Sequence, residues 1–217
     1  MSFYDRNEAG RLLADRLMSY RHDDTIVMAV PRGGVIVASE IARTLDVEMD
    51  IVLAKKIGAP YNKDYAIGAL SESGCEVIDH EAVKDLQVES SHLERMRLLV
   101  SRELEARRSH LRRGYARVST YGRTVIVVDD GVATGLTLKA AALTLRSDCP
   151  REMVLAVPVA AADSLMLLRP FFDVIICLET SEMFFSVGQF YDLFEPVSEE
   201  TVTTLLREGF GPKALRG

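Results

Sequence analysis

The stretch VIVVDDGVATGLT, residues 125–137, places two adjacent carboxylates beside a turn of small and hydroxylated residues. The apolar run before Asp129 predicts a buried parallel strand, so Asp129 and Asp130 should lie at its carboxyl end, where open α/β folds bind ligands. The turn brings two flexible glycines and two hydroxyls: Gly131, Gly135, Thr134 and Thr137. Together with the amides that open the next helix, these groups predict an anion-binding cup.

Two carboxylates repel a phosphate unless the ligand also brings hydroxyl donors or a divalent cation. A ribose 5-phosphate with its 2,3-diol, accompanied by Mg²⁺, satisfies all of these groups. For an isolated Asp-Asp-Gly sequence the ordinary alternative is that Asp130 caps the next helix and Gly131 eases the turn. The combination of two acids, two glycines and two threonines in one strand-to-helix turn favours the ligand site.

The same stretch resembles the 5-phosphoribosyl 1-diphosphate (PRPP) binding motif of type I phosphoribosyltransferases, in which hydrophobic residues and two acids precede a T-G-x-T loop. The resemblance implies that Asp129 and Asp130 hold the ribose hydroxyls, directly or through water on Mg²⁺. It also implies that the 5-phosphate is wrapped by the loop Gly131, Val132, Ala133, Thr134, Gly135, Leu136 and Thr137. Receiver domains also carry an acid pair after a strand, but they open with it and lack the T-G-x-T loop, so we set that interpretation aside.

A second candidate loop is VPRGGV, residues 30–35, where Arg32 supplies a forked donor and Gly33 and Gly34 let backbone amides approach a ligand. Alone, such a sequence is more often only a turn. Beside the PRPP motif it resembles the diphosphate loop of the family, which makes Arg32 a catalytic and binding residue. That loop commonly carries a cis peptide, and the bond from Val30 to Pro31 is an inexpensive place for one.

Lys55 and Lys56 end the neighbouring predicted strand, and we expect at least one of them to reach the diphosphate or the base. The ordinary alternative for a lysine pair at a strand end is a solvated edge.

The segment MFFSVGQFYDLF, residues 183–194, is rich in aromatic rings: Phe184, Phe185, Phe190, Tyr191 and Phe194. Such rings can stack on a planar base, as in the hood of the family, or pack the segment against the core. We expect packing for most of them. Phe190 and Tyr191 are the candidates for stacking, because the turn at 187–189 would bring backbone amides close to a ligand.

These groups must be positioned by alternating strands and helices. Strands are expected over 25–30, 49–58, 124–129, 152–158 and 173–179, and helices over 35–45, 136–147, 161–168 and 198–208, after an opening helix capped by Asp5 and Glu8. This order predicts a doubly wound, mainly parallel α/β sheet flanked by helices. A strand pair over 64–79 and a helix over 89–115, with Glu103 and Arg107 as an i,i+4 pair, predict an insertion at roughly 60–118. A hood at roughly 180–217 completes one domain over 1–217.

Composition limits the class of protein. The 217 residues are 48% hydrophobic, and 26 basic against 32 acidic residues give a charge of −6, which argues against nucleic acid or an anionic membrane as partner. Three scattered cysteines, Cys75, Cys149 and Cys177, and four unpaired histidines indicate reduced thiols without a disulfide framework or zinc site. A charged, helix-patterned start and no apolar run of about 20 residues predict a cytoplasmic protein without a signal peptide.

The whole chain resembles a group of bacterial phosphoribosyltransferases of unassigned acceptor. The resemblance rests on five segments in this order: FYDRNEAGRLLA, VPRGGV, YAIGALSESG, the PRPP motif and FFSVGQFY. The resemblance implies a pentosyltransferase of nucleotide metabolism that moves 5-phosphoribosyl from PRPP to a nitrogenous base, a purine or a pyrimidine. Mg²⁺ would neutralise the departing diphosphate. We expect PRPP, an unidentified base and a second copy of the chain, in a homodimer, as partners. The alternative is a regulator that senses PRPP without turning over a base.

One departure concerns the general base. Relatives that use hypoxanthine place an acid immediately before the T-G pair, whereas this chain has Ala133, as adenine-type relatives do. Any base must then come from elsewhere, and Asp64 and Glu72 are the candidates.

Overall fold

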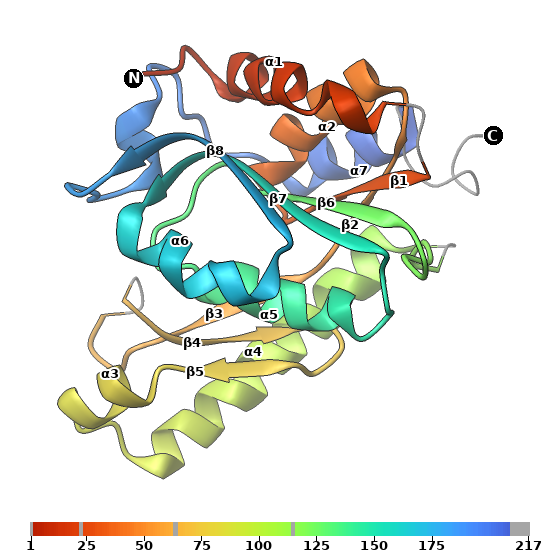
Figure 1. Ribbon diagram of the computed structural model, residues 1–217. Coiled ribbons are helices and arrows are strands. Elements are labelled where there is room, and N and C mark those ends of the chain that lie inside the picture. The colour runs from red at the N-terminus through yellow and green to blue at the C-terminus, as the bar shows by residue number, and fades with distance from the viewer. Residues whose placement is uncertain (1, 22–23, 63–64, 114–115, 209–217) are drawn as a thin grey trace.

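The computed structural model describes residues 2–21, 24–62, 65–113 and 116–208. Its centre is a five-stranded parallel sheet in the order β2-β1-β6-β7-β8 (Figure 1). The strands are β1 (Thr25–Ala29), β2 (Glu48–Ile51), β6 (Thr124–Val128), β7 (Glu152–Ala161) and β8 (Val174–Ser181). The mainly parallel α/β fold that the sequence predicts is therefore confirmed.

Helices cover both faces of this sheet. On one face lie α1 (Arg6–Arg16), α2 (Gly34–Leu45) and α7 (Glu199–Glu208), and on the other lie α5 (Leu136–Arg146) and α6 (Ala162–Leu168) (Figure 1). Three short 3₁₀ turns, η1 (Met18–Tyr20), η2 (Arg169–Phe171) and η3 (Val187–Phe190), connect these elements. Because both faces are covered, β1 and β6 are almost wholly apolar, and every residue of these two strands is buried.

The opening helix begins where the sequence predicts. The Asp5 carboxylate accepts a hydrogen bond of 2.8 Å from the Glu8 amide, and the Glu8 carboxylate accepts one of 2.5 Å from the Tyr4 amide. These two bonds satisfy amide groups that the start of a helix leaves without partners. The predicted cap is confirmed.

The segment expected as one strand over 49–58 is two strands, which corrects that prediction. Its first half is β2, parallel to β1, and its second half is β3 (Ala54–Gly58), antiparallel to β4 (Ala66–Ser71) in a separate sheet of order β3-β4-β5. The chain changes sheet at Val52 and Leu53. The Val52 amide still donates to the Ala29 carbonyl of β1, whereas the Leu53 amide donates to the Glu72 side chain.

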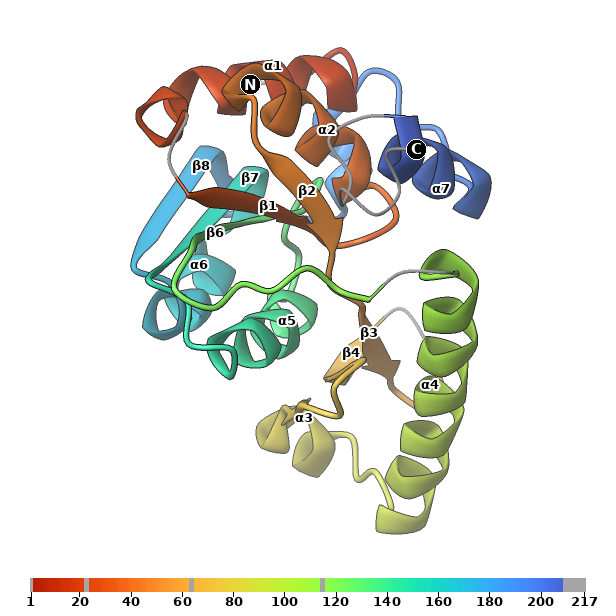
Figure 2. The same cartoon turned by 90° about the vertical axis from the view of Figure 1, so that its right-hand side faces the viewer.

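The insertion stands apart from the main sheet and begins at β3, before residue 60. It contains β3, β4, β5 (Glu76–Ile78), the short helix α3 (His80–Asp85), which the sequence analysis did not predict, and the long helix α4 (Ser90–Leu111). Helix α5 packs between the two sheets, and α4 runs along the small sheet towards α7 (Figure 2). Val100, Leu104 and Leu111 are the buried residues of α4.

The tail of the chain packs against the amino-terminal segment. The Phe3 amide donates to the Phe190 carbonyl at 2.8 Å, and the Asp192 amide donates back to the Phe3 carbonyl at 2.9 Å. The expected hood over 180–217 extends to residues 209–217, which lie outside the described residues. Among the helices that the structure describes, none combines the length and the apolar character needed to cross a bilayer.

Candidate active site

The acid pair lies where β6, the middle strand of the sheet, ends at its carboxyl edge. Asp129 is half-buried, and its Oδ1 accepts a hydrogen bond of 2.8 Å from the Asp130 amide. Burial raises the pKa of Asp129 well above its usual range, and the neighbouring Asp130 carboxylate raises it further. The Asp130 amide and the Arg6 guanidinium act in the opposite direction. A cationic or hydroxyl-rich ligand at this edge would therefore favour the charged form of Asp129.

Asp130 is fixed by a residue that the sequence analysis did not single out. Arg6 of α1 donates from Nε to Asp130 Oδ2 at 2.7 Å, with only 9% and 14% of the two side chains exposed. The Arg6 Nη1 donates to the Glu195 carbonyl at 2.8 Å, and the guanidinium lies 3.8 Å from the centre of the Phe194 ring. Its position inside a capped helix gives no local signal for this role, because the contact spans 124 residues of sequence.

The loop at 31–34 packs directly against the acid pair. A Cβ atom added to Gly33 would lie 1.8 Å from Asp130 Oδ2, and one added to Gly34 would lie 2.9 Å from the Asp129 Cα. The cis peptide joins Pro31 to Arg32, one bond after the place named from the sequence. The Arg32 side chain is exposed. The two candidate loops thus lie in contact with one another.

The loop after the acids forms a cup at the start of α5. A cavity of about 170 Å³ is lined here by Lys56, Ala66, Asp129, Gly131, Val132, Ala133, Thr134, Gly135, Thr137, Leu138 and Val187. Gly135 has a φ of +74°, which favours glycine, and α5 begins at the next residue. The amides of the first turn of α5 have no acceptor inside the helix, an arrangement that suits an anion.

Two residues of the predicted loop have structural roles instead. Val132 is 2% exposed and its amide donates to the Val159 carbonyl of β7, so this amide is committed to the sheet. The Leu136 side chain is 6% exposed and packs into the core. Ala133 and Thr134 are exposed, so the cup is formed by backbone and hydroxyl groups.

A larger cavity of about 460 Å³ continues from the cup and shares Lys56 and Thr137 with it. It is lined by Pro31, Arg32, Ala54, Lys55, Lys56, Glu103, Leu104, Arg107, Thr137 and Glu199. The two lysines reach it from β3 of the small sheet rather than from a strand of the main sheet. The Lys55 Nζ contacts Glu103 Oε2 at 2.5 Å. The predicted lysines therefore lie beside Arg32, although the strand that carries them was assigned to the wrong sheet.

The prediction that Glu103 and Arg107 form an i,i+4 ion pair is wrong. Glu103 pairs with Lys55, while the Arg107 Nε donates to Glu199 Oε1 of α7 at 2.8 Å. Both side chains turn towards tertiary partners on other elements, which local spacing does not reveal. Arg107 and Glu199 are site residues that the sequence analysis missed.

The stacking role predicted for Phe190 and Tyr191 is also wrong, because these rings are 9% and 7% exposed. The Tyr191 ring lies 5.5 Å from the Phe3 ring, and its hydroxyl donates to the Asp130 carbonyl at 2.6 Å. Burial raises the pKa of Tyr191, and the Asp130 carboxylate adds to this effect. Tyr191 thus supports the backbone of Asp130 and Phe190 packs in the core, whereas Phe185 has an 88% exposed side chain.

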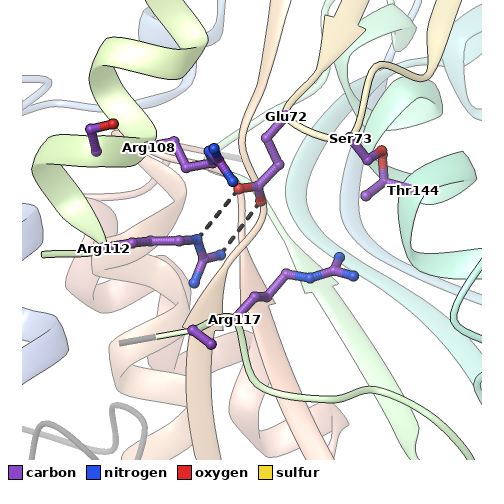
Figure 3. A pocket seen from close by; sticks show the side chains of 8 residues that line it. Glu72, Ser73, Arg108, Arg112, Arg117 and Thr144 are labelled. Carbon is purple, nitrogen blue, oxygen red and sulfur yellow. Dashed lines mark hydrogen bonds and ion pairs between the residues drawn. The ribbon is translucent and has the colours of Figure 1, made fainter. Parts of the chain in front are cut away.

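Of the two candidates for the general base, Glu72 lies away from the acids. Glu72 follows β4, where it accepts from the Leu53 amide at 3.1 Å and from Arg112 at 3.4 Å (Figure 3). It lines a different cavity, of about 420 Å³, with Ser73, Arg108, Ser109, Arg112, Ala116, Arg117 and Thr144. Asp64 lies outside the described residues.

The carboxylates suit a metal ion that arrives with its ligand. In the described ranges there is no cluster of three or more His, Cys, Asp or Glu side chains able to hold a metal, and Asp130 is already bound to Arg6. Magnesium commonly keeps several waters and binds through one or two carboxylates together with substrate phosphates. Asp129 and Asp130 fit that mode, directly or through water, rather than a cage made by the protein alone.

A parallel sheet whose middle strand ends in an acid pair and a threonine-glycine cup, facing a glycine loop, defines the type I phosphoribosyltransferase fold. The sequence model of the phosphoribosyl transferase domain matches residues 4–195, and the chain belongs to this family. Two curated proteins of Mycobacterium tuberculosis, from strains CDC 1551 and H37Rv, are provisionally named phosphoribosyl transferases and are each 36% identical over 204 residues.

These alignments cover 94% of this chain and 46% of each curated relative, so the chain spans about half the length of those proteins. The crystal structure of TT1426 from Thermus thermophilus is 38% identical and superposes with a TM-score of 0.79. That alignment covers 96% of this chain and 99% of the other. The whole architecture, including the insertion, is therefore shared with a solved structure.

Proposed function

We propose that this domain binds PRPP with Mg²⁺ and transfers its 5-phosphoribosyl group to a nitrogenous base, releasing diphosphate. The observation that carries the proposal is the contact of Gly33 with Asp130, where an added Cβ would lie 1.8 Å from the carboxylate oxygen. This contact joins an anion-binding loop and an acid pair into one surface. A ligand with phosphates at both ends of a ribose matches such a surface.

Each part of PRPP has a matching group. The 5-phosphate fits the cup at the start of α5, with Thr134, Gly135 and Thr137. The ribose diol faces the acid pair at the end of β6. The diphosphate fits the larger cavity, where Arg32 and the two lysines supply positive charge.

In the proposed reaction, a nitrogen of the base attacks C1 of the ribose as the bond from C1 to the diphosphate oxygen breaks. The electron pair of that bond leaves with diphosphate, and the nitrogen releases its proton to water. Asp129 and Asp130 would hold Mg²⁺, directly or through water, and the bound ion would supply positive charge to the departing diphosphate. The protein contributes position and electrostatics: the acids fix the ribose, and Arg32 with the Gly33 and Gly34 amides holds the leaving group.

The test is calorimetric titration of PRPP, with and without Mg²⁺, into the wild type and an Asp129→Asn/Asp130→Asn variant. We expect Mg²⁺-dependent binding that the variant loses. Asp163→Asn, at an exposed acid in the first turn of α6, is the matched control and should bind as the wild type does. A folded wild type that does not bind PRPP would overturn the proposal.

Turnover is measured next as diphosphate released from PRPP in the presence of a panel of purine and pyrimidine bases. Release that depends on one base supports the transferase and identifies its acceptor. Tight PRPP binding with no release for any base would favour a PRPP-sensing regulator instead.

A further inference from the structure

The larger cavity contains two cations that are each held by a glutamate. Lys55 pairs with Glu103 at 2.5 Å, and Arg107 pairs with Glu199 at 2.8 Å. The second pair joins the insertion helix α4 to helix α7, which lies near its carboxyl end (Figure 2), and both partners line the cavity. In the Arg107–Glu199 pair, buried polar atoms are left without hydrogen-bond partners.

Two polar atoms of that pair are buried without a hydrogen-bond partner: Arg107 Nη2 and Glu199 Oε2. The side chains as a whole are 22% and 33% exposed. A buried guanidinium donor without an acceptor is costly, since a donor normally keeps a partner in protein or water. The Nε of Arg107 is therefore held by Glu199, the Nη2 donor lacks an acceptor, and the Arg107 side chain lines the larger cavity.

Arg32 makes an anion the fitting acceptor. Arg32 and Arg107 both line the cavity. Burial lowers the pKa of Arg107, Glu199 opposes this effect, and the charge of Arg32 adds to the lowering. The two guanidinium groups thus repel one another, and an anion placed between them would relieve the repulsion.

We infer that Arg107 is a further diphosphate-binding residue of this site, presented by the insertion helix, and that Glu199 is its partner on α7 but is not needed for binding the ligand. The inference rests on the proposed PRPP site and extends it onto α4. A planar guanidinium binds phosphate oxygens through two parallel donors, which a lysine cannot reproduce.

The alternative is that the pair only braces α4 against α7. Glu199 separates the two roles. If the pair is a brace, removing either partner should have the same effect. If Arg107 binds diphosphate, removing Glu199 leaves the cation in place and takes a negative charge away from the anion site.

The experiment titrates inorganic diphosphate with Mg²⁺, and separately PRPP with Mg²⁺, into Arg107→Gln, Arg107→Lys, Glu199→Gln and wild type. We expect Arg107→Gln to bind both ligands roughly tenfold more weakly, the effect of losing about one charge-assisted hydrogen bond. Arg107→Lys should fall between, and Glu199→Gln should bind as tightly as wild type or more tightly. Arg108→Gln is the matched control, because Arg108 is exposed on the same helix and does not line this cavity.

Thermal unfolding shows which variants are folded at the titration temperature, and Arg107→Lys replaces the glutamine variant if the latter unfolds. Diphosphate binding by Arg107→Gln equal to that of wild type would overturn the inference. Equal losses in Arg107→Gln and Glu199→Gln would also overturn it, in favour of the brace. In both cases PRPP binding that depends on Asp129 and Asp130 would leave the proposed function intact, whereas a wild type that binds neither ligand would remove that function itself.

Discussion

Replacing Gly33 with alanine probes the contact that unites the two loops. The backbone at Gly33 has φ −59° and ψ −40°, a conformation that alanine adopts readily. The obstacle is the side chain of Asp130, whose Oδ2 and Cγ would lie 1.8 and 2.5 Å from the new methyl group. Because real Cβ atoms do not approach so closely, the Asp130 carboxylate must move.

The loss of stability can be estimated from the bond to Arg6 that Asp130 would lose. Its bond to Arg6 is 2.7 Å long and mostly buried, and a hydrogen bond between charged groups contributes about 1.5–3 kcal/mol. We expect the free energy of unfolding to fall by about 2 kcal/mol, or a melting temperature lower by about 4–8 °C for a chain of this size. The displaced carboxylate would also leave the ribose site, so PRPP binding should be lost.

Differential scanning calorimetry and PRPP titration measure the two effects on one sample. Gly74→Ala is the control: its φ of +84° makes alanine strained by about 1–2 kcal/mol, yet nothing lies within 4 Å of the added methyl. That variant should lose similar stability and keep full PRPP binding. A Gly33→Ala protein that melts and binds like wild type would refute the assignment of this contact.

Three further predictions follow from buried groups. Tyr191→Phe removes the bond of 2.6 Å to the Asp130 carbonyl and should lower the free energy of unfolding by about 1 kcal/mol, measured in urea, without changing the binding of a base. Burial raises the pKa of Cys177 to about 11, so about one Cys177 thiol in a thousand is ionised at pH 8. Cys177 should therefore react with a coloured thiol reagent far more slowly than the exposed Cys149 does. Unfolding in urea should remove the difference in rate. Arg112→Met leaves the buried Asp50 carboxylate unpaired and should cost about 3–5 kcal/mol at pH 7.5. Because burial raises the pKa of Asp50, its protonated form is favoured in the folded state, and part of that loss should return as the pH falls towards 5; equal losses at both pH values would contradict this explanation.

The main sheet could be predicted because its signals are local. The run at 125–128 is wholly apolar and ends in acids and glycine, which is sufficient to mark a central parallel strand. The same criterion failed over 49–58, where apolar residues continue from Ile51 to Leu53 without a break. The change of sheet there depends on the acceptors of two amides, the Ala29 carbonyl and the Glu72 carboxylate, and neither is near in sequence.

The same distinction between local signals and contacts distant in sequence applies to the residues of the candidate site. Residues at strand ends, such as Asp129 and Arg32, could be chosen as candidates because a strand end followed by glycine is visible in the sequence. Arg6 and Arg107 were missed because each reaches the site from a helix whose own pattern is ordinary. The stacking prediction for Phe190 and Tyr191 was wrong for a related reason. It relied on a nearby turn in the sequence, whereas Tyr191 packs against Phe3, which is distant in sequence.

The insertion is anchored by the same helix that presents Arg107. Five residues further along, at the carboxyl end of α4, Arg112 binds both oxygens of Asp50 at 3.0 and 3.1 Å and contacts Glu72 after β4 (Figure 3). Five residues turn a helix by about 140°, so the anchoring side chain faces the core while Arg107 faces the cavity. Fixing one side chain therefore fixes the direction of the other. Loss of Arg112 should accordingly weaken diphosphate binding as well as stability, although Arg112 lines a different cavity.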